Sequence, residues 1–301
     1  MDERFDRLSG RESIYPSDSP FQPKFLELNG RRLAYLDEGR GEKTILMVHG
    51  NPVSGYVYDK LMRLLVGEYR CVVPDLIGFG LSDKPPAEAD YSLPGHISII
   101  EAFVESLDLE NVILVGHDWG GPVGFGAAVR RQERYARLVI LNTMTEAPMQ
   151  IRPVYWLPFH ILLRTKRLFA YLVKERNLFQ KLGVAIMEPK DQAVYFRANH
   201  SPATRAGIAA FPRMLPYKRS HENYPILKEI LSALKAWDIP SLVIFSDRDS
   251  VFTAAQGQRF AGQMRNGRFV LIPGAKHFLQ YERPSAVAKE IRTFLTSQSQ
   301  S

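Results

Sequence analysis

The sequence has a single cysteine, Cys71, among its 301 residues, so an internal disulfide is excluded. Because Cys71 begins a short apolar run, we interpret it as a small core residue. No apolar run approaches the roughly 18 residues that indicate a transmembrane helix. Residues 1–4 are mostly charged and are not followed by the apolar segment of a secretory signal. We therefore expect a cytoplasmic protein without a transmembrane segment.

Clusters with metal-ligand spacing and nucleic-acid recognition motifs are also missing. We expect no metal, no cofactor and no nucleic-acid partner. Acidic residues are scarce in one segment: residues 147–227 hold 13 Lys/Arg and 4 Asp/Glu, a charge of 13 − 4 = +9, which leaves 7 − 9 = −2 for the rest. This excess indicates a solvated basic face. The alternative is a docking surface for an acidic protein partner or an anionic membrane surface.

Short, continuous apolar runs recur along the chain, as expected for strands buried on both faces of a parallel sheet. Helical apolar spacing lies between several of them, for example across residues 100–107, and again across residues 287–295. Residues 25–36 instead predict a hairpin around the turn pair Asn29-Gly30. Strands alternating with helices predict an α/β protein with a mostly parallel, doubly wound sheet. The expected central strands are residues 45–48, 71–73, 112–115, 138–141, 242–245 and 269–272.

This alternation stops after Leu141 and resumes near Leu242. The stretch between them has many aromatic residues, scattered prolines and no clear strand, and residues 156–179 predict one or two amphipathic helices. We interpret residues 147–227 as a helical cap. The cap is inserted into a core formed by residues 1–146 and 228–301.

The motif Gly116-His117-Asp118-Trp119-Gly120 follows one of the apolar runs and precedes a helical stretch of small residues. A strand, a glycine-flanked turn and a helix form the nucleophile elbow of the α/β-hydrolase fold, here with aspartate in place of the usual serine. An ionised carboxylate needs no base in order to attack an sp3 carbon. We therefore predict that Asp118 forms an alkyl ester, which a water activated by a histidine then hydrolyses.

His277 is the expected base, because it lies in the loop after the last expected strand. A histidine base needs a carboxylate that fixes its tautomer and stabilises the imidazolium. Asp249, four residues beyond the end of the preceding strand, is our prediction for this acid, with Asp247 as the alternative. The chain order Asp118, Asp249, His277 is that of the α/β-hydrolase fold.

Two neutral hydrogen-bond donors are expected beside the nucleophile. Asn51 follows the first central strand, in the loop that supplies one oxyanion-hole N–H in this fold, and Trp119 supplies the other. Their side-chain N–H groups would also stabilise a leaving halide, which is weakly basic and needs donors rather than a proton. Alternatively, Asn51 only begins the turn to Pro52. His49 and His117 lie in the same motifs and are expected to shape turns.

Together these segments resemble the haloalkane dehalogenases, over most of residues 25–295 and least in the cap. Two departures are the continuation at residues 53–56, which is less aromatic than usual, and Ser246, where glycine is frequent. Asn142 stands where some haloalkane dehalogenases carry the catalytic acid, so the resemblance is to the third subfamily of these enzymes. The matching motifs are HGNP at residues 49–52, PDLIGFGLSDKP at 74–85, GHDWGG at 116–121 and AKHF at 275–278.

The resemblance implies hydrolytic dehalogenation of a small apolar haloalkane to an alcohol and a halide. That subfamily also contains the β-lactone decarboxylases of bacterial olefin biosynthesis, which open cis-3-alkyl-4-alkyloxetan-2-ones by carboxylate attack and release CO2 and an alkene. Epoxide hydrolases are a further alternative, but they normally carry an aromatic residue at Asn51 and use cap tyrosines as acids. An inactive binding protein is disfavoured, because every catalytic position is filled. The implied site comprises Asp118, His277 and Asp249, with Asn51 and Trp119 as halide-stabilising residues.

Overall fold

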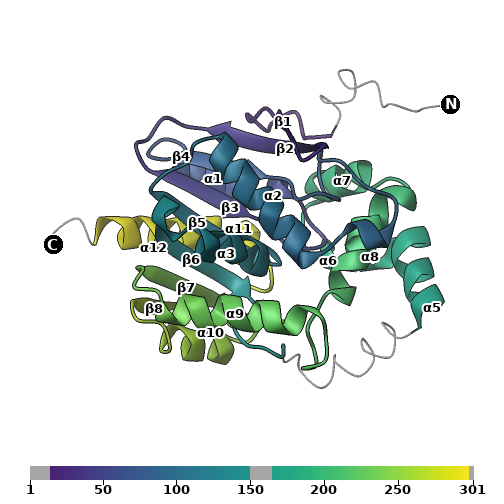
Figure 1. The fold of residues 1–301 in the computed structure, drawn as a ribbon. Coiled ribbons are helices and arrows are strands. Elements are labelled where there is room, and N and C mark those ends of the chain that lie inside the picture. The colour runs from purple at the N-terminus through teal and green to yellow at the C-terminus, as the bar shows by residue number, and fades with distance from the viewer. Residues whose placement is uncertain (1–13, 150–164, 298–301) are drawn as a thin grey trace.

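The computed structural model describes residues 14–149 and 165–297 (Figure 1). Its strands are β1 (Lys24–Leu28), β2 (Arg31–Glu38), β3 (Thr44–Val48), β4 (Arg70–Pro74), β5 (Val112–Asp118), β6 (Tyr135–Thr143), β7 (Ser241–Ser246) and β8 (Gly267–Ile272). They form one eight-stranded sheet in the order β1-β2-β4-β3-β5-β6-β7-β8. The β1–β2 and β2–β4 pairs are antiparallel and all others are parallel. The predicted mostly parallel sheet of the α/β-hydrolase fold is confirmed.

The local sequence signals account for these strands. Each of the six expected apolar runs lies within one strand of the sheet, and β3, β5 and β7 are buried along their whole length. The predicted hairpin is β1–β2, where Asn29 and Gly30 both have positive φ angles of 51° and 73°. Positive φ at both central residues is what a two-residue hairpin turn of this kind requires.

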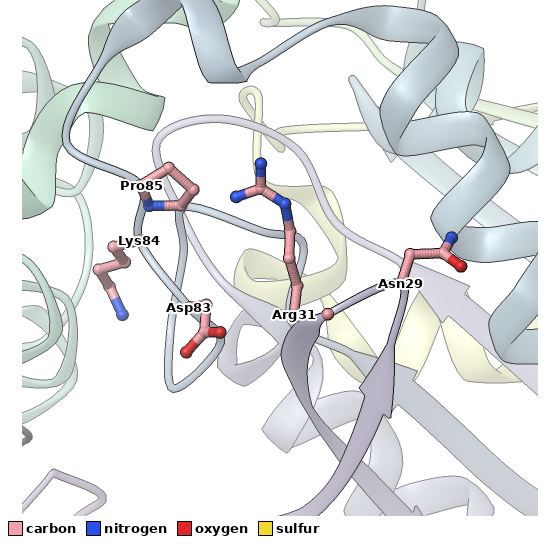
Figure 2. Close-up of a pocket in the computed structure, with 6 residues that line it drawn as sticks. Asn29, Arg31, Asp83, Lys84 and Pro85 are labelled. Carbon is pink, nitrogen blue, oxygen red and sulfur yellow. The ribbon is translucent and has the colours of Figure 1, made fainter.

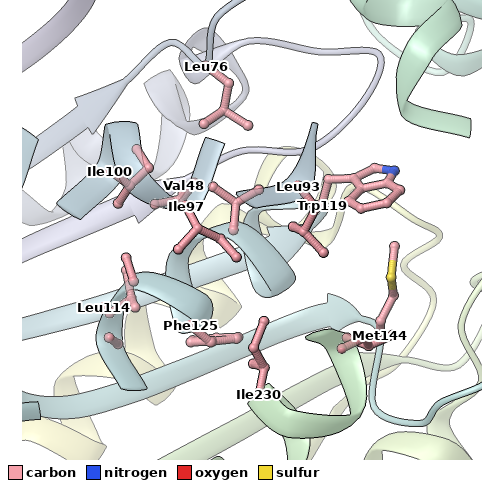
Figure 3. Close-up of a cluster of buried hydrophobic side chains, with 14 of the residues drawn as sticks. Val48, Leu76, Leu93, Ile97, Ile100, Leu114, Trp119, Phe125, Met144 and Ile230 are labelled. Atoms are coloured by element: carbon pink, nitrogen blue, oxygen red, sulfur yellow. The ribbon is translucent and has the colours of Figure 1, made fainter. Parts of the chain in front are cut away.

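Helices cover both faces of the sheet, and alternate strand residues pack against each layer. Leu46 and Val48 of β3 belong to the cluster on one face (Figure 3), whereas Ile45 and Met47 belong to the cluster on the other. The first face is covered by α2 (Leu93–Ser106), α3 (Gly120–Arg130), α9 (Asn223–Ala236) and α10 (Ala254–Ala261), the second by α1 (Asp59–Leu65), α11 (Leu279–Glu282) and α12 (Pro284–Thr296). Single 3-10 turns are η1 (Gly55–Tyr58), η2 (Glu88–Asp90), η3 (Gln132–Arg134) and η5 (Ala203–Arg205).

An insertion between β6 and β7 lies at one end of the sheet (Figure 1). Its described part, from residue 165 to α9, contains helices and no strand. Part of the predicted helical stretch 156–179, including Trp156, lies outside the described residues. The division into a cap at 147–227 and a core stays a prediction. The helices of the insertion are α5 (Lys166–Ala170), the π-helical turn η4 (Tyr171–Glu175), α6 (Leu178–Gly183), α7 (Pro189–Ala198) and α8 (Ala206–Arg213).

A buried carboxylate ties this insertion to the sheet domain. Asp191 of α7 is only 2% exposed. Its two oxygens accept hydrogen bonds from the hydroxyl groups of Tyr56, at 2.8 Å, and Tyr281, at 2.7 Å. The ammonium group of Lys60 lies 3.7 Å from the same carboxylate. Since buried polar groups are costly when unpaired, this network fixes the position of α7 over the sheet domain.

Candidate active site

The elbow forms where β5 meets α3. Asp118 is the last residue of β5 and has a φ of 51°, in the left-handed region, and α3 begins two residues later at Gly120. A Cβ atom on Gly120 would lie 1.9 Å from the carbonyl oxygen of Val48. A Cβ atom on Gly50 would lie 2.2 Å from Asp118 Oδ1. Both positions therefore require glycine, because the loop that follows β3 passes directly beside the elbow.

The Asp118 carboxylate is buried, with 8% of the residue exposed. Its Oδ1 accepts a hydrogen bond of 2.8 Å from the backbone N–H of Asn51. Burial raises the pKa of Asp118, and the opposing influences are the charge of His277 and the backbone N–H groups of Trp119 and Asn51. The two N–H groups therefore converge on this carboxylate, and their role as an oxyanion hole stays a prediction.

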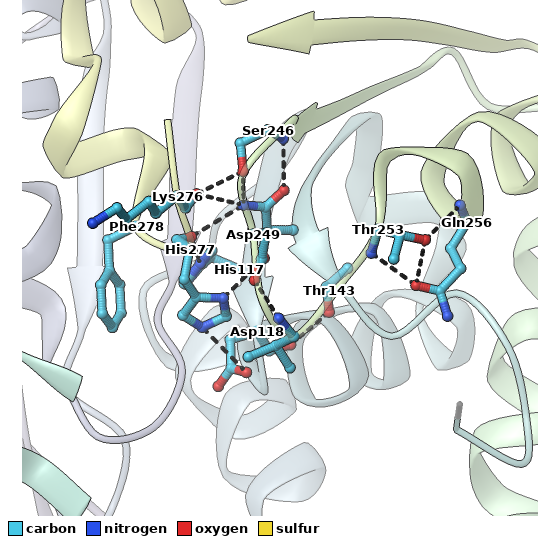
Figure 4. Close-up of polar contacts among 12 residues, drawn as sticks. His117, Asp118, Thr143, Ser246, Asp249, Thr253, Gln256, Lys276, His277 and Phe278 are labelled. Atoms are coloured by element: carbon cyan, nitrogen blue, oxygen red, sulfur yellow. Dashed lines mark hydrogen bonds and ion pairs between the residues drawn. The ribbon is translucent and has the colours of Figure 1, made fainter. Parts of the chain in front are cut away.

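His277 lies between β8 and α11, with its ring between two carboxylates (Figure 4). Its Nδ1 is 2.9 Å from Asp249 Oδ2, and its Nε2 is 3.7 Å from Asp118 Oδ2. Burial opposes the protonated ring, but the charges of Asp249 and Asp118 outweigh it and raise the pKa of His277 to about 9. The other oxygen of Asp249 accepts the N–H of Val251 at 2.7 Å.

The alternative acid, Asp247, is directed elsewhere. It is exposed, and its Oδ1 accepts the backbone N–H of Gly274 at 2.7 Å. The structure therefore brings Asp118, His277 and Asp249 together and leaves Asp247 outside the group.

Two residues that were not predicted as site residues hold the histidine loop. Asn142, at the end of β6, has its amide nitrogen 3.1 Å from the carbonyl oxygens of Lys276 and His277. The ring of His117 donates through Nε2 to the same His277 carbonyl at 2.9 Å. Burial lowers the pKa of His117 well below its usual value, so its ring is neutral. In the sequence, the only signal for Asn142 was its place at the end of a strand.

His49 organises the neighbouring turn. Its Nδ1 donates to the carbonyl of Gly50 at 2.8 Å, and its Nε2 accepts the N–H of Leu76 at 2.9 Å. Burial lowers the pKa of His49 to about 4, which keeps the ring neutral. This arrangement agrees with the turn-shaping role expected for it.

A cavity of about 1050 Å3 opens above Asp118 and His277. Its wall is mainly apolar, with charged residues such as Arg248, Lys276 and Glu282 also among those lining it. The insertion supplies much of this apolar wall, including Phe169, Leu172, Val173, Phe179, Leu182 and Leu215.

Asn51 and Trp119 both line this cavity. The Trp119 ring makes a T-shaped contact with the ring of Phe211 at a centroid distance of 5.3 Å. In Figure 3 its indole nitrogen points away from Leu93. The amide nitrogen of Asn51 is 3.4 Å from the carbonyl of Ile208. Its amide oxygen is buried without a hydrogen-bond partner. Both side chains thus reach the cavity, but the Asn51 amide is turned toward Ile208 of α8, and their role as donors to a halide stays a prediction.

A second depression, of about 510 Å3, lies beside the β1–β2 turn (Figure 2). Its one carboxylate, that of Asp83, accepts the backbone N–H of Arg32 at 2.8 Å, and no histidine lines it. Within the described residues, no group of three or more His, Cys, Asp or Glu could hold a metal ion. The lining residues of the depression are Asn29, Gly30, Arg31, Asp83, Lys84 and Pro85.

This strand order, an elbow after β5 and a histidine loop after β8 are the features of an α/β hydrolase. A family profile described as alpha/beta hydrolase fold matches residues 43–284, and the chain belongs to that family.

Individual relatives refine this assignment. The chain is 33% identical to the cis-3-alkyl-4-alkyloxetan-2-one decarboxylase of Shewanella oneidensis, over 92% of this chain and 89% of that protein. It is 29% identical to haloalkane dehalogenase 2 of Mycobacterium tuberculosis, over 92% and 96% of the two chains. The crystal structure of the haloalkane dehalogenase DatA from Agrobacterium tumefaciens superimposes with a TM-score of 0.83 at 25% identity, covering 92% and 97%. The resemblance expected from the motifs is confirmed, and these relatives support an enzyme.

Proposed function

We propose that this enzyme cleaves haloalkanes through a covalent alkyl ester on Asp118 that His277 helps to hydrolyse. The observation that carries the proposal is the buried ring of His277 between two carboxylates, with Nε2 3.7 Å from Asp118 Oδ2 and Nδ1 2.9 Å from Asp249. A structural ion pair would not need a third group that orients the histidine, a glycine-flanked elbow and a large apolar cavity at the same place.

In the first step, Asp118 attacks the carbon that bears the halogen. Oδ1 is held by the Asn51 N–H, which leaves Oδ2 as the attacking atom. The C–O bond forms as the carbon–halogen bond breaks, and the halide leaves with the bonding electrons. The indole N–H of Trp119 and the Asn51 amide, once turned from Ile208, stabilise that halide.

In the second step, ester formation removes the negative charge of Asp118. His277 then loses one of the negative charges that hold its proton, so its pKa falls and the ring can release that proton. Neutral His277 takes a proton from water, and the hydroxide attacks the Asp118 carboxyl carbon. The backbone N–H groups of Asn51 and Trp119 stabilise the tetrahedral oxyanion. Collapse releases the alcohol, which receives the proton from His277.

A second candidate is decarboxylation of a β-lactone. The 33% identity to a cis-3-alkyl-4-alkyloxetan-2-one decarboxylase favours it, and so does an apolar cavity of about 1050 Å3, which has room for alkyl chains. Asp118 would attack the sp3 ring carbon bonded to the ring oxygen, and the bond between that carbon and the oxygen would break to free a carboxylate. Loss of CO2 would then form the alkene and expel Asp118. Water is not consumed on this route.

The cavity offers little support for epoxide hydrolysis, which needs an acid that protonates the alkoxide. Of the tyrosines in the insertion, Tyr155 lies outside the described residues. The others, Tyr171, Tyr195, Tyr217 and Tyr224, are not among the residues that line the cavity.

The decisive test is to trap the ester in the His277→Phe variant. Without the base, hydrolysis should slow by roughly 10²- to 10⁴-fold while alkylation continues. Intact-protein mass spectrometry should then show one added alkyl group from a bromoalkane, and peptide mapping should place it on Asp118. The His200→Phe variant, altered at an exposed histidine of the insertion, is the control and should not accumulate the ester.

Release of an alkene from a β-lactone, without an adduct from a bromoalkane, would assign the second function, and an adduct formed only from an epoxide would assign epoxide hydrolysis. Absence of any adduct, together with no alkene from a β-lactone, would refute covalent catalysis. Turnover in 18O-water provides an independent measure. Dehalogenation places 18O in the Asp118 carboxyl group, whereas the β-lactone route leaves it unlabelled.

We further propose that the enzyme acts in the cytoplasm and that its basic insertion meets an anionic surface. No helix in the described part of the chain has the length and apolar character needed to cross a bilayer. The charge of +9 in residues 147–227, against −2 elsewhere, supports an anionic contact.

A further inference from the structure

The segment from α5 to just beyond α6 concentrates exposed apolar side chains. Six large hydrophobic side chains are substantially exposed among the described residues. Five of them lie within residues 168–186. The sixth is Leu271, in the edge strand β8. The five are Leu168 (50% exposed), Tyr171 (49%), Leu178 (41%), Leu182 (68%) and Ile186 (37%).

Positive charges are interleaved with these side chains. Residues 167–186 contain four Lys/Arg and a single acid, Glu175, a net charge of 4 − 1 = +3. We call the five apolar residues and these four cations the cap patch. The four cations are Arg167, Lys174, Arg176 and Lys181.

The cavity opens through the apolar part of the cap patch. Leu178, Leu182 and Ile186 are exposed and also line the cavity above Asp118. Figure 1 shows α5 at the outer edge of the insertion, away from the sheet. A ligand that enters here therefore passes apolar side chains that alternate along the chain with lysine and arginine.

We propose that the cap patch docks on an anionic lipid bilayer, with the cavity mouth facing the lipid. Apolar side chains flanked by lysine and arginine bind such a surface by burying apolar area at the headgroup boundary and by attraction to anionic lipids. A folded protein partner seated on the same patch would close the mouth. A second copy would bring two positively charged patches together. A lipid surface, in contrast, leaves the cavity mouth accessible to the substrate. It also dissolves the apolar substrate that the proposed function requires.

Vesicle sedimentation with the full chain tests this docking. The protein should sediment with vesicles of phosphatidylcholine and phosphatidylserine but not with phosphatidylcholine alone, and added salt should weaken the binding. The Arg176→Glu/Lys181→Glu variant should bind at least about tenfold more weakly. The Leu168→Asn/Tyr171→Asn variant should also bind more weakly although its charge is unchanged.

The matched control is Lys228→Glu/Lys289→Glu, which makes the same charge change at exposed positions of α9 and α12. This variant should bind like the wild type. The proposal is overturned if the wild type does not bind anionic vesicles at low salt, or if the control loses as much binding as the patch variants. Binding to poly-glutamate without binding to vesicles would replace the membrane by an acidic protein. A dimer that the patch variants dissociate would replace it by a second copy.

The four patch residues that these variants change do not line the cavity. The kcat/KM for a short, water-soluble substrate should therefore stay within about twofold of the wild type. Loss of vesicle binding with unchanged turnover separates a failure of docking from a failure of the proposed reaction.

Discussion

Replacing Asp249 by asparagine should change how the stability of this enzyme depends on pH. Asp249 is buried, and its Oδ2 lies 2.9 Å from His277 Nδ1. Burial alone would lower the pKa of His277, and Asp249 is the largest of the groups that raise it. Asparagine keeps the shape of the side chain and removes its charge, so the pKa of His277 falls in the Asp249→Asn variant.

The magnitude follows from the pKa of His277 in the folded protein. It is raised from 6.5 to about 9, and at about 1.4 kcal/mol per unit this difference corresponds to about 3–4 kcal/mol of unfolding free energy. A raised folded pKa means that the folded state binds the proton more tightly. The stabilisation is therefore complete below pH 6.5 and is lost as the pH rises through about 9. In Asp249→Asn only the smaller influences of Asp118 and Glu282 still support the protonated ring, so this decline should shrink to a fraction of its size.

Urea unfolding at intervals from pH 6 to pH 10 measures the decline, with roughly constant ionic strength because surface charges are screened by salt. Other groups that titrate in this range contribute equally to both proteins and cancel in the difference. Asp247→Asn is the control, since it removes an exposed carboxylate two residues away that binds the Gly274 N–H instead. Equal declines in the wild type and Asp249→Asn would refute the assignment of Asp249 as the partner of His277. A smaller decline in Asp247→Asn would favour Asp247.

Three further substitutions have defined outcomes. Gly50→Ala should abolish activity or folding, because its Cβ atom would lie 2.2 Å from Asp118 Oδ1; activity near the wild-type level would contradict the packing of the elbow. Trp119→Phe keeps an aromatic ring but removes the indole N–H, so kcat for dehalogenation should fall roughly 10²-fold in steady-state assays. An unchanged kcat would exclude a role of the Trp119 N–H at the halide. Asp191→Ala leaves the hydroxyl groups of Tyr56 and Tyr281 without their acceptor and should lower the free energy of unfolding in urea by about 2–4 kcal/mol. A decrease below about 0.5 kcal/mol would show that these hydrogen bonds contribute little to stability.

The parts of this enzyme that could be predicted from its sequence are those with a local cause. Buried strands appear as short apolar runs, and the carboxyl ends of parallel strands meet at one edge of the sheet. The proximity of Asp118, at the end of β5, and His277, in the loop after β8, therefore follows from the sequence pattern. The choice between Asp249 and Asp247 had no such signal, because both follow β7 within three residues. It depends on the path of that loop, in which Val251 and Gly274 each offer an N–H to a different carboxylate.

The insertion could be predicted only as a helical region, for a different physical reason. Its helices are short, and a leucine on a short helix shows the same local pattern whether it faces the core, the cavity or solvent. Phe169 is fully buried beside Leu168 at 50% exposure, and Leu182 is 68% exposed only two residues before the buried Val184. Which residue takes which environment is decided by contacts with distant segments. The apolar rim of the cavity therefore emerged only in three dimensions, although the positive charge around it was already visible in the sequence.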